Sequence, residues 1–323
     1  RRIDEHLEAL LVPRGTVTLA GTDLADRYDA TLAMAEWAEQ HGCLAVSLSE
    51  HHASDDGYLP SPLLMAAAIA SRTSSIAIAI NALIAPFYDP LRLAEDVAVL
   101  DQISRGRVAL TLGAGYAEHE FEMFGVSLSD RPAIIRETVD TLRKAWTGEP
   151  FEFRGRTVQV RPTPTQPGGP AIILGGSSEP AARRAARIAD GFIPSVEEAW
   201  PHYRDECLKL GKPDPGDGMN VNAEVVFLAE DPEAAWPELG PYFLHESNAY
   251  GAWNPTAGDG AYEQVADIDQ LRSGNQYKIV TPDEYARYVD EVCMGVARLH
   301  PMVGGIPPEL AWDQLRLFEK HFL

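Results

Sequence analysis

The segment SLSEHHASDDG, residues 47–57, places two histidines and three acids directly after a short apolar run that is typical of a strand. Imidazoles beside carboxylates can hold a metal ion, form a hydrogen-bonded structural corner, or supply acid–base groups to an enzyme. A metal needs three or four converging ligands, whereas adjacent side chains diverge. We therefore predict no metal here. His51 becomes a candidate acid–base residue, while Glu50 either orients a histidine or closes an ion pair.

A glycine and serine run follows another apolar stretch, in LGGSSEPAARRAARIADG, residues 174–191. Glycines permit close backbone approach and a helix N-terminus offers unpaired N–H groups, which together suit a phosphate. The alternative is an ordinary tight turn in which Ser178 caps the helix. Three arginines in the helix, at positions 183, 184 and 187, lie beyond its first turn and are expected on a solvated face.

Two further features could serve a flat, anionic ligand. Gly113 and Gly115 flank Ala114 at a strand end, where missing side chains make room, although glycine also simply terminates strands. Tyr116 follows them as a candidate substrate contact. Arg131 begins a predicted helix, where a cation opposes the helix dipole unless an anion compensates it. Its alternative is an exposed residue at a frayed end.

The elements that must position these residues alternate between strand and helix. Eight apolar runs alternate with helix-period segments, several of which have Pro or Asp in the first turn. This order predicts an α/β fold with a closed (β/α)8 TIM barrel, with a doubly wound sheet as the alternative. The carboxyl ends of the strands would then share one face, where four groups that follow strands converge. They are Glu50, His51 and His52; Asn81; Gly113, Ala114, Gly115 and Tyr116; and Gly175, Gly176, Ser177 and Ser178. The predicted strands are 17–20, 44–48, 76–80, 107–112, 171–174, 191–193, 223–228 and 297–303.

We expect residues 1–323 to form a single domain with a few departures from regular alternation. Residues 1–16 are interpreted as an N-terminal extension, which contains the tag-like sequence LVPRG. Residues 151–170 predict a hairpin around Arg154-Gly155. A long insertion after strand 7, about 229–280, shows little periodicity and is interpreted as a lid that carries candidate substrate contacts. Those contacts are His245, Tyr250 and Trp253, with His52 from the earlier loop.

Composition excludes several classes of partner. The net charge of −21 argues against nucleic acid and anionic membranes, and no apolar stretch is long enough to cross a bilayer. Three widely spaced cysteines indicate a reducing compartment, so a cytoplasmic location is expected.

Taken together, five pieces of the sequence resemble the bacterial luciferase-like flavin oxidoreductases. They are SEHH, NALIAPFYDPLRLAEDVAVLDQISRGRVALTLGAGYAEHEFEMFG, Arg131, AWTGEPFEFRG and LGGSSEPAARRAARIADG. The resemblance runs from about Tyr28 to Pro194 and resumes at YKIVTPDEYARYV and VARLHPMVGGIPPELAWDQLRLFEKHF. It implies a luciferase-like TIM barrel and a cofactor that is either reduced FMN or the deazaflavin coenzyme F420.

The resemblance also implies roles for individual residues. His51 matches the family's catalytic histidine, and Asn81-Ala82 matches its non-prolyl cis peptide. Gly113 matches the position that faces the reactive carbon of the ring. Ala114 stands where luciferase has a second phosphate arginine, which implies weaker flavin binding or a phosphate held mostly by N–H groups. The phosphate site would comprise Arg131, Gly175, Gly176, Ser177 and Ser178.

The leading functional hypothesis is a two-component monooxygenase that receives reduced FMN from a separate reductase and uses O2 to oxygenate a small organic substrate. An F420-dependent hydride-transfer enzyme is the second, and a non-catalytic flavin-binding protein is the third. The resemblance also implies a homodimer.

Overall fold

The computed structural model describes residues 8–11, 24–54, 56–218, 224–253, 262, 264–274, 276–292 and 296–323. The chain divides into two compact units. Unit 1 comprises Arg1–Pro60 and Asn222–Leu323, and unit 2 comprises Ser61–Val221. Each unit is described by itself.

Unit 2 contains parallel strands that pair in the order β3, β4, β7 and β8. Apart from Thr111, their buried residues are apolar, as expected for strands that pack in a core. The register places Ile80 beside Leu110 and Leu174 beside Phe192. The predicted strands of this unit are thus confirmed, as β3 (Ala77–Ile84), β4 (Val108–Gly113), β7 (Ile172–Gly176) and β8 (Gly191–Pro194).

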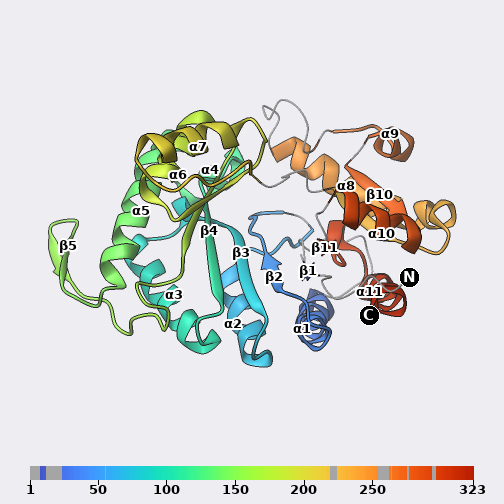
Figure 1. Cartoon of the computed structure of the whole chain (residues 1–323), viewed down its shortest axis with the longest axis horizontal. Helices are drawn as coiled ribbons and strands as arrows, with labels where there is room; N and C mark the ends of the chain where they lie inside the picture. Colours follow the sequence, from blue (N-terminus) through green and yellow to red (C-terminus); the bar gives the residue numbers. More distant parts are fainter. Residues whose placement is uncertain are drawn as a thin grey trace. The chain divides into compact units, whose positions relative to one another are not determined.

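The helices of unit 2 follow the strands in sequence, and α3 packs between α2 and α5 (Figure 1). Four of them begin with proline in the first turn, where the missing N–H is not needed. The helices are α2 (Pro62–Arg72), α3 (Pro90–Ser104), α4 (Glu118–Phe124), α5 (Arg131–Ala145), α6 (Glu179–Ile188) and α7 (Ala199–Lys209).

The predicted hairpin is confirmed as β5 (Phe151–Phe153) and β6 (Arg156–Val158). Its two turn residues, Arg154 and Gly155, have φ of 47° and 74°. Both therefore lie in the left-handed region that a two-residue hairpin turn requires. Asp101 of α3 anchors the chain after the hairpin, because its carboxylate accepts the backbone N–H groups of residues 165 and 166.

Unit 1 holds parallel strands in the order β11, β1 and β2, and a second parallel pair, β9 and β10. They are β1 (Glu8–Leu11), β2 (Ala45–Leu48), β9 (Val225–Leu228), β10 (Tyr277–Val280) and β11 (Val296–Leu299). The helices are α1 (Leu24–Gln40), α8 (Pro232–Trp253), α9 (Ile268–Ser273), α10 (Pro282–Glu291) and α11 (Pro308–Phe322).

Strand β1 corrects the interpretation of residues 1–16 as an extension. Residues 8–11 pair with both β2 and β11, so they belong to the sheet. Four residues carry too little pattern for the sequence to indicate a strand here. The strand predicted at 17–20, and residues 12–15 of LVPRG, lie outside the described residues.

The expectation that residues 229–280 lack regular structure is wrong. The described part of this segment holds α8, α9 and β10, and β10 pairs with β9 along its length. The helix was obscured because Pro237 and Pro241 lie within it. Proline breaks the usual helix pattern in a sequence, although a long helix can accommodate it at a kink.

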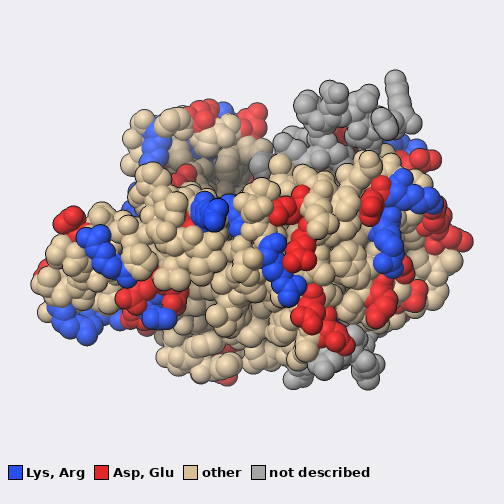
Figure 2. All heavy atoms as spheres, turned by 90° about the horizontal axis from the view of Figure 1, so that it is seen from below, with Lys and Arg blue, Asp and Glu red and all other residues tan. Residues whose placement is uncertain are grey.

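Charged side chains occur in small groups on one face of the molecule. On the face shown in Figure 2, Lys and Arg side chains occur with Asp and Glu among them. Among the residues the structure describes, no helix has the length and apolar character needed to cross a bilayer.

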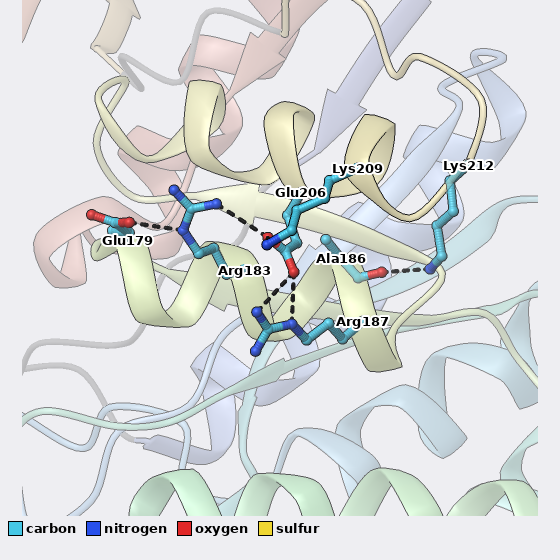
Figure 3. A network of polar contacts seen from close by, with 7 residues as sticks. All are labelled: Glu179, Arg183, Ala186, Arg187, Glu206, Lys209 and Lys212. Atoms are coloured by element: carbon cyan, nitrogen blue, oxygen red, sulfur yellow. Dashed lines mark hydrogen bonds and ion pairs between the residues drawn. The ribbon is translucent and has the colours of Figure 1, made fainter.

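One buried acid joins α6 to α7 in unit 2. The Glu206 side chain is 2% exposed and accepts hydrogen bonds from Arg187 and Arg183, at 2.8 and 3.1 Å (Figure 3). Arg187 is the main cause that lowers the pKa of Glu206, and Arg183 adds to it, while burial opposes the shift. The Glu206 carboxylate therefore stabilises the packing of these two helices only while it is ionised.

Replacing Glu206 with Gln should lower the free energy of unfolding at neutral pH, because two arginines lose their buried anion. The pKa of Glu206 is lowered on folding, so its contribution is present above the unfolded value of about 4.3 and disappears as the pH falls through the folded value. The unfolding free energies of the wild type and the variant should thus converge at acidic pH. Urea unfolding at several pH values measures this, with Glu179→Gln, an exposed partner of Arg183, as the weaker control. A difference in unfolding free energy between the two proteins that stays constant with pH would contradict this prediction.

Candidate functional site

Strand ends in unit 2 bring together two of the predicted cofactor contacts. The peptide bond between Asn81 and Ala82 is cis, as the resemblance implied. The β3–β4 register shifts here, so that Asn81 lies beside Thr111 but Leu83 lies beside Leu112. A Cβ atom on Gly113 would lie 3.1 Å from the Cβ of Ala82. Glycine at 113 therefore keeps the two strand ends close.

Arg131 is held in a fixed position at the start of α5. Its Nη1 donates to the carbonyl of Gly115 at 2.7 Å, and its Nε donates to that of Leu128 at 2.8 Å. The guanidinium lies 5.9 Å from the ring centre of Phe121. Among the described residues, Nη2 has no hydrogen-bond acceptor and no carboxylate pairs with Arg131. The cation is thus positioned without being neutralised.

Gly115 makes this arrangement possible. Its φ is +73°, and a Cβ there would lie 2.8 Å from the Phe121 ring and 2.9 Å from Ile84. Both the backbone conformation and the available space therefore require glycine. The Gly115 carbonyl then accepts Arg131, so the glycine also determines where the cation lies.

The helix N-terminus at α6 has the features of an anion site. Gly175 and Gly176 end β7, and Ser178 is the N-cap residue but its side chain accepts no capping hydrogen bond. Ser177 and Ser178 are both exposed. A Cβ on Gly176 would lie 2.7 Å from the Cβ of Ala181, so the strand and helix approach closely here. The first-turn N–H groups are consequently left for a ligand or water.

Arg184 was expected on a solvated face with Arg183 and Arg187, and this was wrong. Its side chain is partly buried, and its Nε is buried without a hydrogen-bond partner among the described residues. Burial is the main cause that lowers the pKa of Arg184, and the charges of Arg136 and Arg131 lower it further. No sequence pattern indicates this burial, because the face of α6 that is covered depends on where the helix packs.

These features fit a flavin phosphate. Uncapped N–H groups, exposed hydroxyls and the cations Arg131 and Arg184 are all donors, and a phosphate is an acceptor with up to two negative charges. Tyr116 lies partly buried in the loop between β4 and α4.

The predicted histidine loop in unit 1 forms two separate contacts. His52 pairs through Nε2 with Glu50 at 2.9 Å, and both side chains are buried. Glu50 thus orients a histidine, as one of the two predicted alternatives had it, and that histidine is His52. The His51 N–H donates to the carbonyl of Leu59 at 3.3 Å, which closes the loop.

The His51 imidazole lies among aromatic rings from the same unit. It is 6% exposed and contacts Tyr58 and Tyr250 edge to face, with ring centres 4.9 and 5.3 Å away. Trp253 lies over it at 4.5 Å with a tilt of 32°. Two of the predicted lid residues, both from α8, therefore enclose the candidate catalytic residue.

Hydroxyl groups connect the loop to α8. The Tyr58 hydroxyl lies 2.5 Å from that of Ser49 and 2.6 Å from that of Tyr250. The third predicted lid residue, His245, bonds through Nε2 to the carboxylate of Asp56 at 2.9 Å. Within unit 1 the structure thus brings together His51, His52, His245, Tyr250 and Trp253.

Sequence reasoning missed Asp56, Tyr58 and Arg27 in this cluster. The two aspartates of SLSEHHASDDG could have pointed to Asp56, but only the position of α8 shows which of them meets His245. Arg27 looked like an ordinary polar helix residue, yet its side chain is fully buried. Among the described residues, no group of three or more His, Cys, Asp and Glu side chains could hold a metal.

Comparison with known proteins places the chain among flavin enzymes. A family model described as luciferase-like monooxygenase matches residues 10–289. The oxygenase component of a flavin-dependent trigonelline monooxygenase from Acinetobacter baylyi is 25% identical over 242 residues, 70% of this chain and 66% of that protein. An F420-dependent glucose-6-phosphate dehydrogenase from Nakamurella multipartita is 33% identical over 193 residues, 55% of each chain. The chain thus spans 66% and 55% of the length of these relatives.

A solved structure shows the shared fold. The oxygenating constituent of 3,6-diketocamphane monooxygenase from Pseudomonas putida, in complex with FMN, aligns over 98% of both chains with a TM-score of 0.73 and 23% identity. The α/β fold therefore matches that of luciferase-like TIM-barrel proteins, whose members use FMN or F420.

Replacing Gly115 with Ala should destabilise the protein by about 1–3 kcal/mol for backbone strain and by a similar amount for overpacking. Gly125→Ala is a matched control, since its φ is +65° but a Cβ there meets nothing within 4 Å. Thermal and urea unfolding measure both variants. Equal losses of stability in the two variants would show that Phe121 and Ile84 move aside at no cost in free energy.

Proposed function

The chain belongs to the luciferase-like monooxygenase family, and on that premise we propose that it is the oxygenase component of a two-component monooxygenase. It would receive reduced FMN from a separate reductase and oxygenate a small organic substrate with O2. Reduced FMN, when bound, supplies the reaction with oxygen, and the protein supplies binding and proton transfer. A homodimer and a single domain in which residues 229–280 act as a lid are parts of this proposal.

The observation that carries the proposal is the cationic site at α6 in unit 2. Arg131 is fixed by two backbone carbonyls, while Arg184 has a buried Nε without a protein acceptor. Like charges near one another are unfavourable unless an anion joins them. We assign the phosphate to these arginines, to the N–H groups that follow Gly175 and Gly176, and to the hydroxyls of Ser177 and Ser178.

The ring would lie by the strand ends that carry Asn81, Ala82 and Gly113, where the absence of a side chain on Gly113 leaves space. Tyr116, on the loop after the same strand as Gly113, stays a candidate substrate contact. Luciferase has a second phosphate arginine at the position that Ala114 occupies in this chain. Arg184 would replace that arginine in part.

We assign proton transfer to His51. Histidine is the side chain that most readily both accepts and donates a proton near neutral pH. The rings of Tyr58, Tyr250 and Trp253 surround it and exclude water. Water exclusion is what a reaction with a reactive oxygen species needs.

An F420-dependent hydride transfer is the second candidate, favoured by the 33% identity to an F420-dependent dehydrogenase. The same anion site would hold the deazaflavin's phosphate, and no O2 would be consumed. An anaerobic titration with reduced FMN and with reduced F420, followed by mixing with O2, distinguishes the two. Saturable binding of reduced FMN and rapid O2 uptake support the monooxygenase. Selective F420 binding would establish the alternative, and FMN binding without any reaction would indicate a non-catalytic flavin-binding protein.

Replacing Arg131 with Met should weaken FMN binding by about ten- to a hundredfold, since a charge-assisted hydrogen bond contributes about 1.5–3 kcal/mol. Riboflavin, which has the same ring but no phosphate, should bind equally to both proteins. Flavin fluorescence measures both affinities, with the exposed Arg92→Met as the control variant. An equal loss for riboflavin would assign Arg131 a structural role.

Replacing His51 with Ala should leave FMN affinity intact and slow the oxygen reaction of bound reduced flavin by about a hundredfold or more. Stopped-flow absorbance of the flavin follows the reaction. His41→Ala, another histidine of unit 1 that bonds to Trp37 and Glu319, should react at the wild-type rate. An unchanged rate in the His51 variant would remove this residue from the mechanism.

A further inference from the structure

We propose that Asp56 and His245 form a second acid–base pair in unit 1, in which His245 takes a proton from a phenol-type hydroxyl of the substrate. This inference rests on the proposed function, since it assigns a substrate class to the same enzyme.

The contact itself has the geometry of an oriented imidazole. His245 Nε2 lies 2.9 Å from Oδ2 of Asp56, whose side chain is 4% exposed, while that of His245 is 37% exposed. A carboxylate accepts only, so Nε2 must carry the proton in this pair. The neutral imidazole is then left with its lone pair on Nδ1, which has no partner among the described residues. Nδ1 is therefore both basic and accessible.

Asp56 is built to remain ionised. Burial by itself raises the pKa of Asp56, but hydrogen bonds from His245, Ser54 and the N–H of Tyr58 outweigh it, and the net pKa is lowered. The Ser54 hydroxyl and the Tyr58 N–H donate to Oδ1 at 2.5 and 2.9 Å, which leaves Oδ2 to His245. Each carboxylate oxygen thus has a donor, and the acid retains its negative charge.

A buried cation supports this charge from α1. Arg27 is fully buried, and its Nε, Nη1 and Nη2 make no hydrogen bond among the described residues. Such a guanidinium is costly to bury, so its presence needs an electrostatic reason. Asp56 is the largest attractive charge acting on Arg27, followed by Tyr242 of α8. Arg27 therefore stabilises the ionised form of Asp56 without competing for its oxygen atoms.

The pair is joined to the aromatic cluster through one residue. Tyr58 donates its N–H to Asp56, and its hydroxyl bonds to Tyr250, which contacts His51. His245 and Tyr250 both come from α8, the orange helix in Figure 1. An aromatic substrate that packs against these rings would present its hydroxyl within the same network.

In the proposed step, one proton moves from the substrate hydroxyl to Nδ1 of His245. The substrate O–H bond breaks as an Nδ1–H bond forms, and the electron pair stays on the substrate oxygen. Asp56 offsets the positive charge of the imidazolium. The resulting phenolate is richer in electrons and more readily attacked by an electrophilic oxygen.

Nitrogen-15 NMR of the full-length protein tests the pair without any turnover. Neutral wild-type His245 should hold its proton on Nε2. Asp56→Asn should lower the fraction of the Nε2–H tautomer, because a neutral amide is a weaker acceptor than a carboxylate. A proton on Nδ1 in the wild type, or an unchanged tautomer fraction in a folded variant, would overturn the pair. The wild-type tautomer decides the matter if Asp56→Asn does not fold.

Glu319→Gln is the matched control. It removes a carboxylate 3.4 Å from His41, a different histidine of unit 1, and should leave the signals of His245 unchanged. Ser54→Ala removes one neutral donor to Asp56 and keeps its charge, so it should change the tautomer fraction of His245 less than Asp56→Asn does. A larger change in Ser54→Ala would assign the effect to loop structure.

The assigned substrate class is tested with 4-nitrophenol, whose absorbance changes on ionisation. Wild type should bind it saturably and convert it to the phenolate below its solution pKa, whereas His245→Gln should bind it as the neutral phenol. No binding, or equal ionisation in both proteins, would overturn the assigned substrate class. Loss of reduced-FMN binding with the Nε2–H tautomer intact would overturn the proposed function instead, so the two failures are distinguishable.

Discussion

Pairing of the parallel strands β3, β4, β7 and β8 fixes where the candidate groups at the strand ends of unit 2 lie. Hydrogen-bonded strands in one direction end at one edge, so the residues that follow them are placed by the ladder and not by loop flexibility. The register shift after Asn81 shows how sensitive this placement is. It brings Ala82 beside the glycine that ends β4, a contact that any larger residue at 113 would change.

Charge compensation separates the structural sites from the candidate functional ones. Glu206 is buried, and its carboxylate pairs with Arg183 and Arg187 of α6 and lies 4.0 Å from Nζ of Lys209, so its charge is compensated within the protein. Arg107 is the converse, a cation whose donors go to the carbonyls of Ala70, Thr73, Ile76 and Ser104. Arg131 and Arg184 keep donors that no described acid accepts, in a chain where acids outnumber basic residues by 48 to 27. Because acids are in such excess, the fact that no described carboxylate pairs with Arg131 or Arg184 is a specific feature of the fold.

Sequence alone predicted what depends on local pattern. Strands such as SIAIAI and the hairpin turn at Arg154-Gly155 follow from apolar runs and from left-handed turn chemistry, and the structure confirms both. Helix α8 was missed because its prolines conceal its periodicity, and β1 was missed because four residues carry too little pattern. Site residues were predictable where they follow a strand, as His51 does. Asp56 and Arg184 were not, because their partners come from distant segments and depend on how helices pack.

His51 and His245, the residues of unit 1 to which we assign proton transfer, differ in what positions them. His51 is enclosed by aromatic rings and lies in a loop closed by its own N–H, so packing sets its position. His245 is partly exposed, and a hydrogen bond to one buried carboxylate orients its ring. A carboxylate only accepts, so this contact holds His245 in the tautomer that leaves Nδ1 to take a proton. Packing thus places one ring, whereas a hydrogen bond selects the tautomer of the other.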